Sequence, residues 1–372
     1  MLARIVFWIA VLIPFYAYIG YPLVLLILRL VIRRDVKKQP IQPFISLLIP
    51  AYNEDDVIAR KIENSLALNY PADRLEIVVA SDGSKDRTAA TAQRLADGKR
   101  VRVLAFGENR GKIATLNASI PDLRGEIIVF SDASAMLPPD SVRRLIENFA
   151  DPTVGAVSGL YKIVKADEVD VGRSEDVYWR YETFLKIQES RLASILGGHG
   201  QMHAIRKELY PYPPPGTIND DYIIPVSVLA KGYRAVYEPT AVVYEEAREM
   251  TGFGRRIRIM AGNVQQLREI KGLLNPLRPL ALFFFLSHKV SRLVVPFAML
   301  AALIANLFLL NTRLYFAIFC AQMIFYLLAV LGTFLPLRPK IVMLPFYFTM
   351  INAAAFLGFY HALTHRRTMA WK

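Results

Sequence analysis

Long stretches without a charged residue alternate with one polar block along this chain. Four such stretches cover residues 5–28, 293–312, 314–337 and 341–365. Each is near or above the roughly 20 apolar residues that a helix needs to cross a bilayer. Because these stretches bracket a single polar block, we favour membrane-spanning helices over buried helices of a large soluble core. The pattern predicts one N-terminal span and about three C-terminal spans.

Inside the polar block, short apolar runs alternate with polar, helix-forming segments. This alternation is typical of βαβ units around a parallel sheet. From residue 154 onward the pattern becomes mixed, so we expect an α/β domain with a mixed second half. The predicted strands are 44–49, 75–80, 101–105, 127–130, 154–160 and 235–237, and the predicted helices are 55–68, 87–97, 175–193 and 222–230.

A basic amphipathic helix is predicted at residues 255–271. Its apolar residues recur at helical spacing, and arginine and lysine occupy other positions. Such a helix typically lies in the plane of the membrane interface, with an ordinary surface helix of the domain as the alternative. The short apolar segment 280–286 is also expected to rest on the membrane, ahead of a span that begins near Leu293. The pattern therefore divides the chain into an anchor (1–34), an α/β domain (44–250), interfacial helices (251–291) and a C-terminal transmembrane region (292–372).

The charges around the first apolar stretch predict its orientation. Five cations follow this stretch, against Arg4 alone before it. Cytoplasmic loops are enriched in Lys and Arg, so we expect the domain in the cytoplasm, on a multi-pass protein of the cell (inner or plasma) membrane. A signal peptide would instead end in a small-residue cleavage site, so we interpret the stretch as a retained anchor. The five cations are Arg29, Arg33, Arg34, Lys37 and Lys38.

The C-terminal end carries conflicting signals. Four full spans would place it outside the cell, whereas the basic residues of 365–367 and Lys372 favour the cytoplasm. The sequence therefore does not decide on which side of the membrane the C-terminal end lies.

Composition narrows the range of partners. The chain has 372 residues, 54% of them apolar, and a formal net charge of +13. Much of the positive charge flanks apolar stretches or lies in 255–271. Membrane lipids and nucleotide phosphates therefore explain it more simply than nucleic acid, and we expect no nucleic-acid partner. Cys320 is the single cysteine and lies inside an apolar run, which excludes an internal disulfide.

Five short motifs follow one another along the polar block. Two of them place an aspartate after an apolar run, and ligands bind at the carboxyl ends of strands in α/β sheets. The motifs are Ile49-Pro50-Ala51-Tyr52-Asn53-Glu54, Ala80-Ser81-Asp82-Gly83-Ser84, Asn109-Arg110-Gly111-Lys112, Phe130-Ser131-Asp132-Ala133-Ser134 and Asn219-Asp220-Asp221.

The order and wording of these motifs resemble family-2 glycosyltransferases, the inverting membrane enzymes that include cellulose and hyaluronan synthases. The resemblance covers roughly residues 44–270. It implies a glycosyltransferase-A-type (Rossmann-like) cytoplasmic domain between N- and C-terminal transmembrane helices. It also implies a nucleotide-sugar donor, most simply a UDP-sugar.

The resemblance assigns the first three motifs to the donor. Tyr52 and Glu54 would help to hold the base and ribose, Asp82 would read the nucleobase edge, and Lys112 would reach a phosphate. Taken alone, residues 53–55 also suit a helix cap, and Lys112 suits a solvated loop lysine. The predicted donor-binding residues are Pro50, Ala51, Tyr52, Glu54, Asp82, Gly83, Lys112, Asp132, Ser134 and Arg255.

Asp132 matches the first acid of the family's Asp-x-Asp motif. Carboxylates at this place hold Mg²⁺ or Mn²⁺, which bridges the diphosphate oxygens. The chain departs from the motif because its third position is Ser134, and a hydroxyl is a weaker ligand than a carboxylate. We therefore expect a metal ion held loosely by Asp132, water and the diphosphate.

The acid pair Asp220-Asp221 matches the element in which the last acid is the family's catalytic base. This selects Asp221 as the base and Asp220 as its neighbour, although paired acids at a helix start are often only stabilised by the helix dipole. Arg258 matches the cation of the family's Gln-x-x-Arg-Trp element and would stabilise the departing diphosphate. Arg255 replaces the Gln, and Ile259 replaces the Trp that stacks on the acceptor sugar in polymerising relatives.

The acceptor side is assigned to a glycine-rich stretch and one aromatic residue. Gly198 and Gly200 would allow close approach of backbone to a sugar. His199 between them would touch the acceptor or diphosphate, with a satisfied structural histidine as the alternative. Trp179 would offer a stacking surface.

These assignments predict a membrane-bound inverting glycosyltransferase that extends a polysaccharide. Transfer of one sugar to a lipid or lipid-linked acceptor is the first alternative, and a catalytically silent export subunit is the second. A secreted polymer needs a channel, normally walled by more than four helices. Polymer export by this chain would therefore require a second copy or an export partner.

Overall fold

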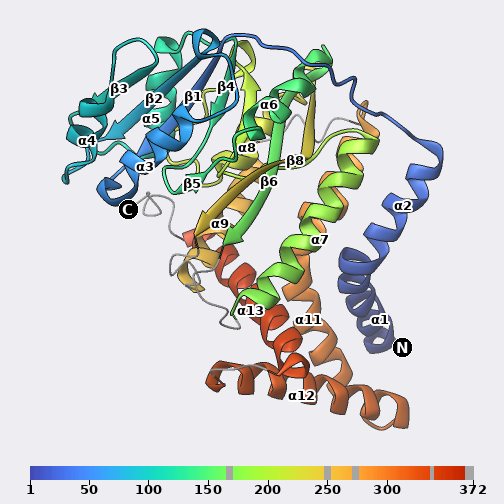
Figure 1. Ribbon diagram of the computed structural model, residues 1–372. Coiled ribbons are helices and arrows are strands. Elements are labelled where there is room, and N and C mark those ends of the chain that lie inside the picture. Colours follow the sequence, from blue (N-terminus) through green and yellow to red (C-terminus); the bar gives the residue numbers. More distant parts are fainter. Residues whose placement is uncertain (165–170, 247–252, 270–275, 336–338, 365–372) are drawn as a thin grey trace.

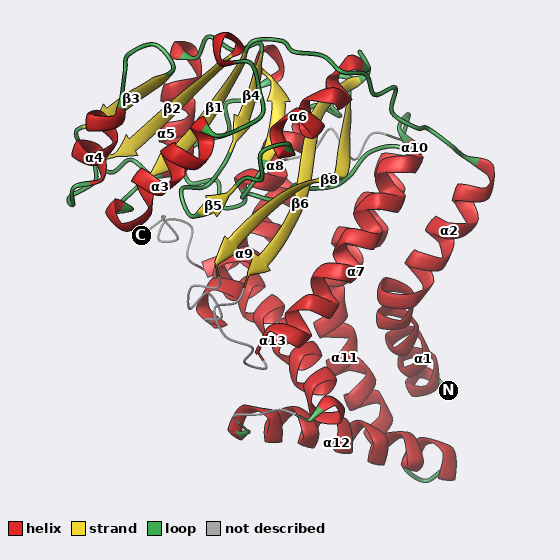
Figure 2. Cartoon of the chain, in the orientation of Figure 1, coloured by secondary structure: helices red, strands yellow, loops and turns green. Residues whose placement is uncertain are grey.

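A computed structural model describes residues 1–164, 171–246, 253–269, 276–335 and 339–364. An α/β domain lies at one end of the molecule and long helices lie at the other (Figure 1). Figure 2 shows that the strands are confined to the domain end. The first long helix is a continuous run in which a π-helical turn at Tyr16–Gly20 separates α1 (Leu2–Phe15) from α2 (Tyr21–Val31).

An eight-stranded mixed sheet forms the centre of the domain, in the order β3-β2-β1-β4-β7-β6-β8-β5. Neighbours among β3, β2, β1 and β4 are parallel, whereas β7 runs antiparallel to both β4 and β6. The carboxyl ends of the parallel strands therefore share one edge. The strands are β1 (Ile45–Ala51), β2 (Leu75–Asp82), β3 (Val101–Phe106), β4 (Ile127–Phe130), β5 (Ala135–Met136), β6 (Val154–Val164), β7 (His203–Arg206) and β8 (Arg234–Glu246).

Five helices appear close to their predicted positions, whereas the helices Lys112–Ser119 and Ser141–Ile146 were not predicted. Short 3-10 turns at Ala72–Arg74, Ile120–Asp122, Glu147–Ala150 and Lys207–Leu209 join some of the elements. The α-helices are α3 (Asp55–Leu66), α4 (Thr88–Leu95), α5 (Lys112–Ser119), α6 (Ser141–Ile146), α7 (Val171–Leu192), α8 (Asp220–Ser227) and α9 (Phe253–Glu269).

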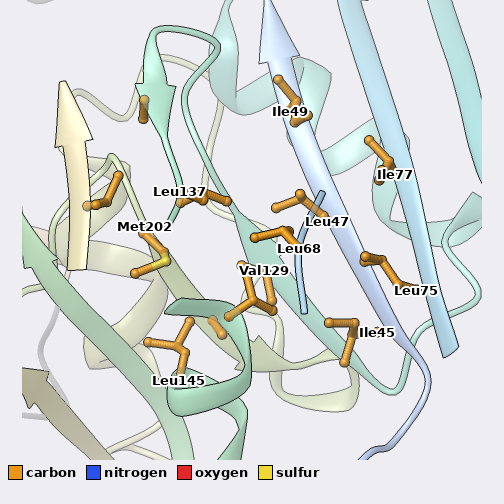
Figure 3. Packing of buried hydrophobic residues seen from close by; sticks show 14 of the residues in the cluster. Ile45, Leu47, Ile49, Leu68, Leu75, Ile77, Val129, Leu137, Leu145 and Met202 are labelled. Carbon is orange, nitrogen blue, oxygen red and sulfur yellow. The ribbon is translucent and has the colours of Figure 1, made fainter. Parts of the chain in front are cut away.

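Strand β1 shows why the sheet is buried on both faces. All seven of its residues are buried, as the continuous apolar run of a central parallel strand requires. Successive side chains point to opposite faces, so Leu48 joins one hydrophobic cluster while Leu47 and Ile49 join the other. Figure 3 shows Leu47 and Ile49 with Val129 and Met202 in the second cluster. Hydrophobic clusters therefore pack on both faces of the sheet that carries the strand-end residues.

Four helical runs in the described chain are long and apolar enough to cross a membrane. One runs from Pro279 to Leu307 and consists of α10 (Pro279–Phe284), a π-helical segment (Phe285–Val290) and α11 (Ser291–Leu307). The segment 280–286 is therefore continuous with α11, where the sequence predicted a separate surface segment. The other three runs are Leu2–Val31, α12 (Arg313–Phe334) and the part Ile341–Thr364 of α13 (Lys340–Thr364).

A buried polar cluster attaches these helices to the domain. The Tyr21 hydroxyl donates a 2.6 Å hydrogen bond to Glu189 of α7, and His288 Nδ1 lies 2.6 Å from the same carboxylate. Arg292 pairs with Glu182, which lies about two helical turns before Glu189 on α7. Helix α2 and the Pro279–Leu307 run are thus both joined to carboxylates of α7.

Helix α9 lies between the domain and α13. A Cβ at Gly358 of α13 would lie 2.6 Å from Met260 Cβ, and a Cβ at Gly262 would lie 2.7 Å from the Asn219 side chain. Two apolar residues of α9, Ala261 and Val264, are buried. Part of the apolar face that suggested a membrane-surface helix therefore packs within the protein.

Candidate active site

The loops that follow β1, β2 and β3 are tied to one another. Asn53 has a φ of 54°, and its side-chain oxygen accepts a 2.8 Å hydrogen bond from the backbone N–H of Lys85. Gly83 has a φ of 63°, and a Cβ there would lie 2.2 Å from the backbone carbonyl carbon of Glu108, so the position requires glycine. The predicted donor residues Tyr52 and Glu54 lie partly buried in the first of these loops.

Asp82 is fully buried at the end of β2. One carboxylate oxygen accepts hydrogen bonds from the Arg110 backbone N–H (2.9 Å) and the Thr115 hydroxyl (2.6 Å). The other oxygen accepts a 2.9 Å bond from the Gly111 N–H. Asp82 therefore orders the loop that leads into α5. Its predicted contact with a nucleobase stays a prediction.

Lys112 begins α5 and lies between two of the predicted acids. Its Nζ is 2.9 Å from Asp132 Oδ1 and 3.0 Å from Asp220 Oδ2. Burial acts against the charged lysine, but the two carboxylates outweigh it and raise the pKa of Lys112 above its ordinary value. Burial also acts to raise the pKa of Asp220, but the Lys112 ammonium reverses this effect and lowers it. Lys112 is thus an inward-facing ammonium group and not a solvated loop lysine.

The pKa of Asp221 is shifted in the opposite direction from that of its neighbour Asp220. Burial, reinforced by the adjacent Asp220 carboxylate, raises the pKa of Asp221 to about 6. Its backbone oxygen accepts a 2.7 Å hydrogen bond from the Gly198 N–H, which holds the glycine-rich stretch against α8. A carboxylate with a pKa near neutrality is suited to accept a proton during catalysis.

Asp132, the predicted metal ligand, and Asp221, the predicted base, both lie close to Gly200, and we call the position between them the space beside Gly200. A Cβ built on Gly200 would lie 3.6 Å from Asp132 Oδ2, 3.8 Å from Asp221 Cβ and 4.0 Å from Lys112 Nζ. Four motifs that are far apart in the sequence therefore converge there.

His199 and Trp179 lie together on the acceptor side of this space. Their rings are 5.5 Å apart in an edge-on arrangement. His199 is 3% exposed, and its Nε2 is 3.3 Å from Lys186 Nζ. Burial, together with the charge of Lys186, holds the pKa of His199 well below its ordinary value. His199 is therefore a neutral, enclosed side chain, as the structural alternative expected.

Helix α9 brings Arg258 to the same side of the domain. The Asn219 amide donates 3.1 Å hydrogen bonds to the Ile259 carbonyl and to Asn263, so this helix is fixed directly beside the acid pair. Ile259 is 38% exposed at the position where the family carries Trp. The side chain of Arg255 lies outside the described part of the structure.

Sequence reasoning missed two buried charged residues behind Asp132. Lys61 of α3 is fully buried, donates a 2.7 Å hydrogen bond to Ser131 Oγ and also bonds the Ala135 carbonyl. Burial lowers the pKa of Lys61 to about 7, against the opposing effect of Asp132 and Glu245. Glu245 of β8 is 5% exposed and accepts a hydrogen bond from Ser134. A lysine at an otherwise apolar helix position was the available signal for Lys61.

His203 was also missed. It stacks on Phe130 with ring centroids 4.8 Å apart, and burial lowers its pKa to about 4. It begins β7, a four-residue strand whose partners β4 and β6 are distant in sequence. No local pattern marks such a strand.

The ligands available at Asp132 suit a hard divalent cation. Asp132 supplies a carboxylate whose side chain is 30% exposed, and Ser134 supplies a hydroxyl oxygen. Mg²⁺-like ions commonly take one or two carboxylates, with substrate phosphates and water completing the shell. Among the residues that the structure describes, no group of three or more His, Cys, Asp or Glu could hold an ion alone. The residues present therefore fit a cation that a diphosphate helps to bind.

Comparison with known sequences assigns part of the chain to a family. A family profile described as glycosyl transferase family 2 matches residues 46–211. This stretch is a family-2 glycosyltransferase domain. The match spans β1 to the loop before α8 and includes the predicted donor motifs except Arg255. The predicted family resemblance is therefore confirmed over this stretch, and Asp220, Asp221 and Arg258 lie beyond it.

Curated relatives of the family-2 domain include two kinds of enzyme. An N-acetylglucosaminyltransferase of Rhizobium leguminosarum bv. viciae is 28% identical over 224 residues, which cover 56% of this chain and 52% of that protein. A poly-β-1,6-N-acetyl-D-glucosamine synthase of Staphylococcus aureus is 27% identical over 230 residues, 60% of this chain and 55% of that protein. The chain thus spans about half the length of the curated relatives it matches.

A solved structure resembles almost the entire chain. The mannosyltransferase PcManGT from Pyrobaculum calidifontis, solved in complex with GDP-Man and Mn²⁺, superposes with a TM-score of 0.74. The alignment covers 97% of this chain and 100% of that chain at 24% identity. The likeness confirms the predicted glycosyltransferase-A-type fold of the domain, and the aligned residues include the long helices.

Proposed function

We propose that this protein is a membrane-bound inverting glycosyltransferase that uses Asp221 as its catalytic base. The observation that carries this proposal is the space beside Gly200, where a carboxylate with a pKa near 6 lies next to Asp132 and Lys112. A base, a cation-binding acid and a fixed ammonium group are the components that transfer from a nucleotide-sugar requires.

The reaction follows from this arrangement. The acceptor hydroxyl gives its proton to the Asp221 carboxylate while its oxygen bonds to C1 of the donor sugar. The bond from C1 to the diphosphate oxygen breaks as the new bond forms on the opposite face, so the configuration inverts. The diphosphate leaves with the electron pair, and Lys112 and Arg258 stabilise its charge. A divalent ion bound at Asp132 would neutralise more of that charge.

The favoured product is a polysaccharide. The N-acetylglucosaminyl relatives support an amino-sugar donor, and a relative named as a polymer synthase supports chain extension. UDP as the carrier of that sugar follows from the family resemblance of the sequence. The mannosyltransferase PcManGT, which has a similar fold, was solved in complex with GDP-Man, so both UDP- and GDP-sugars belong in the first assay.

A single sugar transfer is the second candidate, and Ile259 favours it. This residue is partly exposed on α9, where polymerising relatives carry an aromatic residue that stacks on the growing chain. An aliphatic side chain presents no flat ring to a sugar, so the grip on a long acceptor is weaker. Under this candidate, the acceptor is a lipid or lipid-linked sugar.

Three crossings of the membrane are proposed from the path of the long helices. The Pro279–Leu307 run begins at the domain, where the Arg278 guanidinium donates to the Ala230 carbonyl at 3.3 Å. It ends where Ala302 shares a buried cluster with Phe7, near the start of α1. α13 returns toward the domain, because its Gly358 contacts α9.

Helix α12 links the far ends of the other helices. Its Tyr315 hydroxyl accepts a 3.2 Å hydrogen bond from Trp8 Nε1, and α12 lies across the ends of α11 and α13 (Figure 1). If α12 does not complete a crossing, the C-terminal end of α13 lies on the side of the domain. The basic residues after α13 then agree with the cations after α2, which removes the conflict seen in the sequence.

Cysteine labelling tests this topology. Cys320→Ala/Lys372→Cys should resist a membrane-impermeant maleimide in intact cells and react after permeabilisation. A matched variant, Cys320→Ala/Met1→Cys with an initiator Met placed before it, should react in intact cells. Labelling of position 372 from outside would show that α12 crosses the membrane, and labelling of the domain from outside would reject the orientation altogether.

The function itself is tested with purified protein in detergent. UDP- and GDP-sugars are screened for nucleotide release with and without Mn²⁺, and the product is then sized under excess donor. A ladder or high polymer supports the first candidate, whereas an acceptor extended by one sugar supports the second. Failure to release nucleotide from any donor, with membrane lipids and oligosaccharides supplied, would favour a silent subunit.

A further inference from the structure

The position where the chain departs from the family's metal motif has an unusual partner. Ser134 Oγ donates a 2.5 Å hydrogen bond to Glu245 Oε1. The two residues are far apart in sequence, but β5 pairs with β8 so that Ala135 lies opposite Glu245. The sheet therefore fixes this carboxylate beside the turn that carries Asp132 and Ser134.

Three donors hold the Glu245 carboxylate in one orientation. Besides Ser134, the Tyr161 hydroxyl donates to it at 3.0 Å and the Gln201 amide at 3.2 Å. Glu245 is only 5% exposed, so water has little access to it. Buried Lys61 provides the nearby positive charge and holds the turn through Ser131 and the Ala135 carbonyl.

This geometry changes what the Ser134 hydroxyl can do. A serine hydroxyl has one proton and two acceptor lone pairs. Because the proton is directed at an anionic acceptor, the lone pairs face other directions, and the charge-assisted bond increases the electron density on Oγ. The oxygen is then a better ligand for a hard cation than an ordinary hydroxyl.

We propose that Glu245 makes Ser134 a ligand of the divalent cation, so that the two residues together replace the second aspartate of the family's motif. The proposal rests on the proposed function, because the cation is the one that accompanies the nucleotide diphosphate. Glu245 is a positioning residue here: its oxygens are engaged by three donors, and it acts through Ser134. Residues that orient metal ligands in this way typically contribute about 10–100-fold to metal affinity.

Mn²⁺ binding, followed by electron paramagnetic resonance in the presence of UDP or GDP, tests the proposal without turnover. Ser134→Ala and Glu245→Gln should each weaken Mn²⁺ binding by about 10–100-fold. The double variant should be no weaker than the Ser134→Ala variant, because Glu245 acts on the cation only through Ser134. Tyr161→Phe, which removes another donor from the same carboxylate, should bind Mn²⁺ nearly as the wild type does.

A charge-restoring pair separates this role from a structural one. Ser134→Asp restores the family's motif but places a second carboxylate against Glu245, so repulsion should limit its Mn²⁺ affinity. Ser134→Asp/Glu245→Gln relieves that repulsion and should bind Mn²⁺ at least as tightly as the wild type. A side chain that merely supports the fold would not produce this recovery. Thermal unfolding without Mn²⁺ identifies any variant that is simply destabilised.

The possible outcomes separate the inference about Ser134 and Glu245 from the proposed function on which it rests. Unchanged Mn²⁺ affinity in Ser134→Ala would overturn the inference, because Ser134 would not be a ligand. An equal further loss on adding Glu245→Gln to Ser134→Ala would also overturn it, because Glu245 would then act independently. If the wild type does not bind Mn²⁺ in the presence of either UDP or GDP, the inference fails. The proposed function is then judged separately, by release of nucleotide from a donor sugar without Mn²⁺.

Discussion

Aspartates lie near strand or helix ends both in the loops after β1–β3 and around the space beside Gly200, but the groups that bond to them differ between the two regions. Asp82 accepts hydrogen bonds from two backbone N–H groups and one hydroxyl, and it is fully buried. Asp132, Asp220 and Asp221 instead gather near Lys112, which pairs with the first two.

This difference supports an ordering role for Asp82 and the proposed chemical role for the other three aspartates. A buried carboxylate whose acceptor positions are filled by neutral donors fixes the groups that bond to it. Carboxylates that crowd near one ammonium group keep unbalanced charge, which a cation, a diphosphate or a proton can relieve. Burial first, and the Asp220 carboxylate second, raise the pKa of Asp221, which prepares this group to take up a proton.

The largest effect is expected at Asp221. Asp221→Asn removes the proton acceptor and should lower the transfer rate by about 10²–10⁴-fold, the usual contribution of a general base. Nucleotide binding, measured by calorimetry, should stay close to that of the wild type because the base acts on the acceptor. Asp73→Asn, at an exposed acid on a surface turn, is the control. A variant that kept more than about a tenth of the rate would contradict the assignment.

Asp82→Ala should act on stability instead. The change leaves two N–H groups and the Thr115 hydroxyl without their acceptor, and one unsatisfied buried group costs about 1–3 kcal/mol. Denaturant or thermal unfolding in detergent measures the loss. Asp132→Ala, at a partly exposed carboxylate, should reduce stability less. If Asp82→Ala were as stable as the wild type but changed the preference between UDP and GDP, Asp82 would read the nucleobase as the sequence predicted.

The pH profile sharpens the comparison further. The base must be deprotonated to act, so kcat/KM should fall as the pH drops through about 6, where Asp221 becomes protonated. Well below that midpoint, the fall should approach about tenfold per pH unit for a single base. The residual rate of Asp221→Asn should lack this transition. A midpoint close to the ordinary aspartate value of 3.8 would indicate that Asp221 is not the titrating base.

The smallest effect is expected at Gly200. A Cβ there would make ordinary van der Waals contacts of 3.6–4.0 Å, so Gly200→Ala should fold with unchanged stability. It would still occupy space beside Asp132 and Asp221, so kcat/KM should fall severalfold, mainly through KM for the acceptor. Gly254→Ala, where nothing lies within 4 Å, is the matched control. An unchanged acceptor KM would place the acceptor elsewhere.

Local pattern predicted the domain well where elements are long or strongly apolar. β1, β2 and β4 appear where apolar runs precede the acidic motifs, and α9 follows its helical spacing. β5 and β7 were missed because they are two and four residues long and pair with distant strands. The segment 280–286 was separated from α11 because Lys289 and Arg292 interrupt the apolar pattern, whereas His288 and Arg292 meet acidic partners on α7.

The sequence by itself determined the alternating α/β elements, the apolar helical runs and the strand-end positions of the acids, because these depend on periodicity and neighbouring residues. The local pattern alone could not distinguish the role of Asp82 from that of Asp221; only the family resemblance assigned one to the nucleobase and the other to the base. The donors that satisfy Asp82 come from residues 110–115, and the charges that affect Asp221 include Lys112 and Lys186. Only the tertiary structure decided which carboxylate was satisfied and which was not, because hydrogen bonding and burial depend on residues that folding brings together from distant parts of the chain.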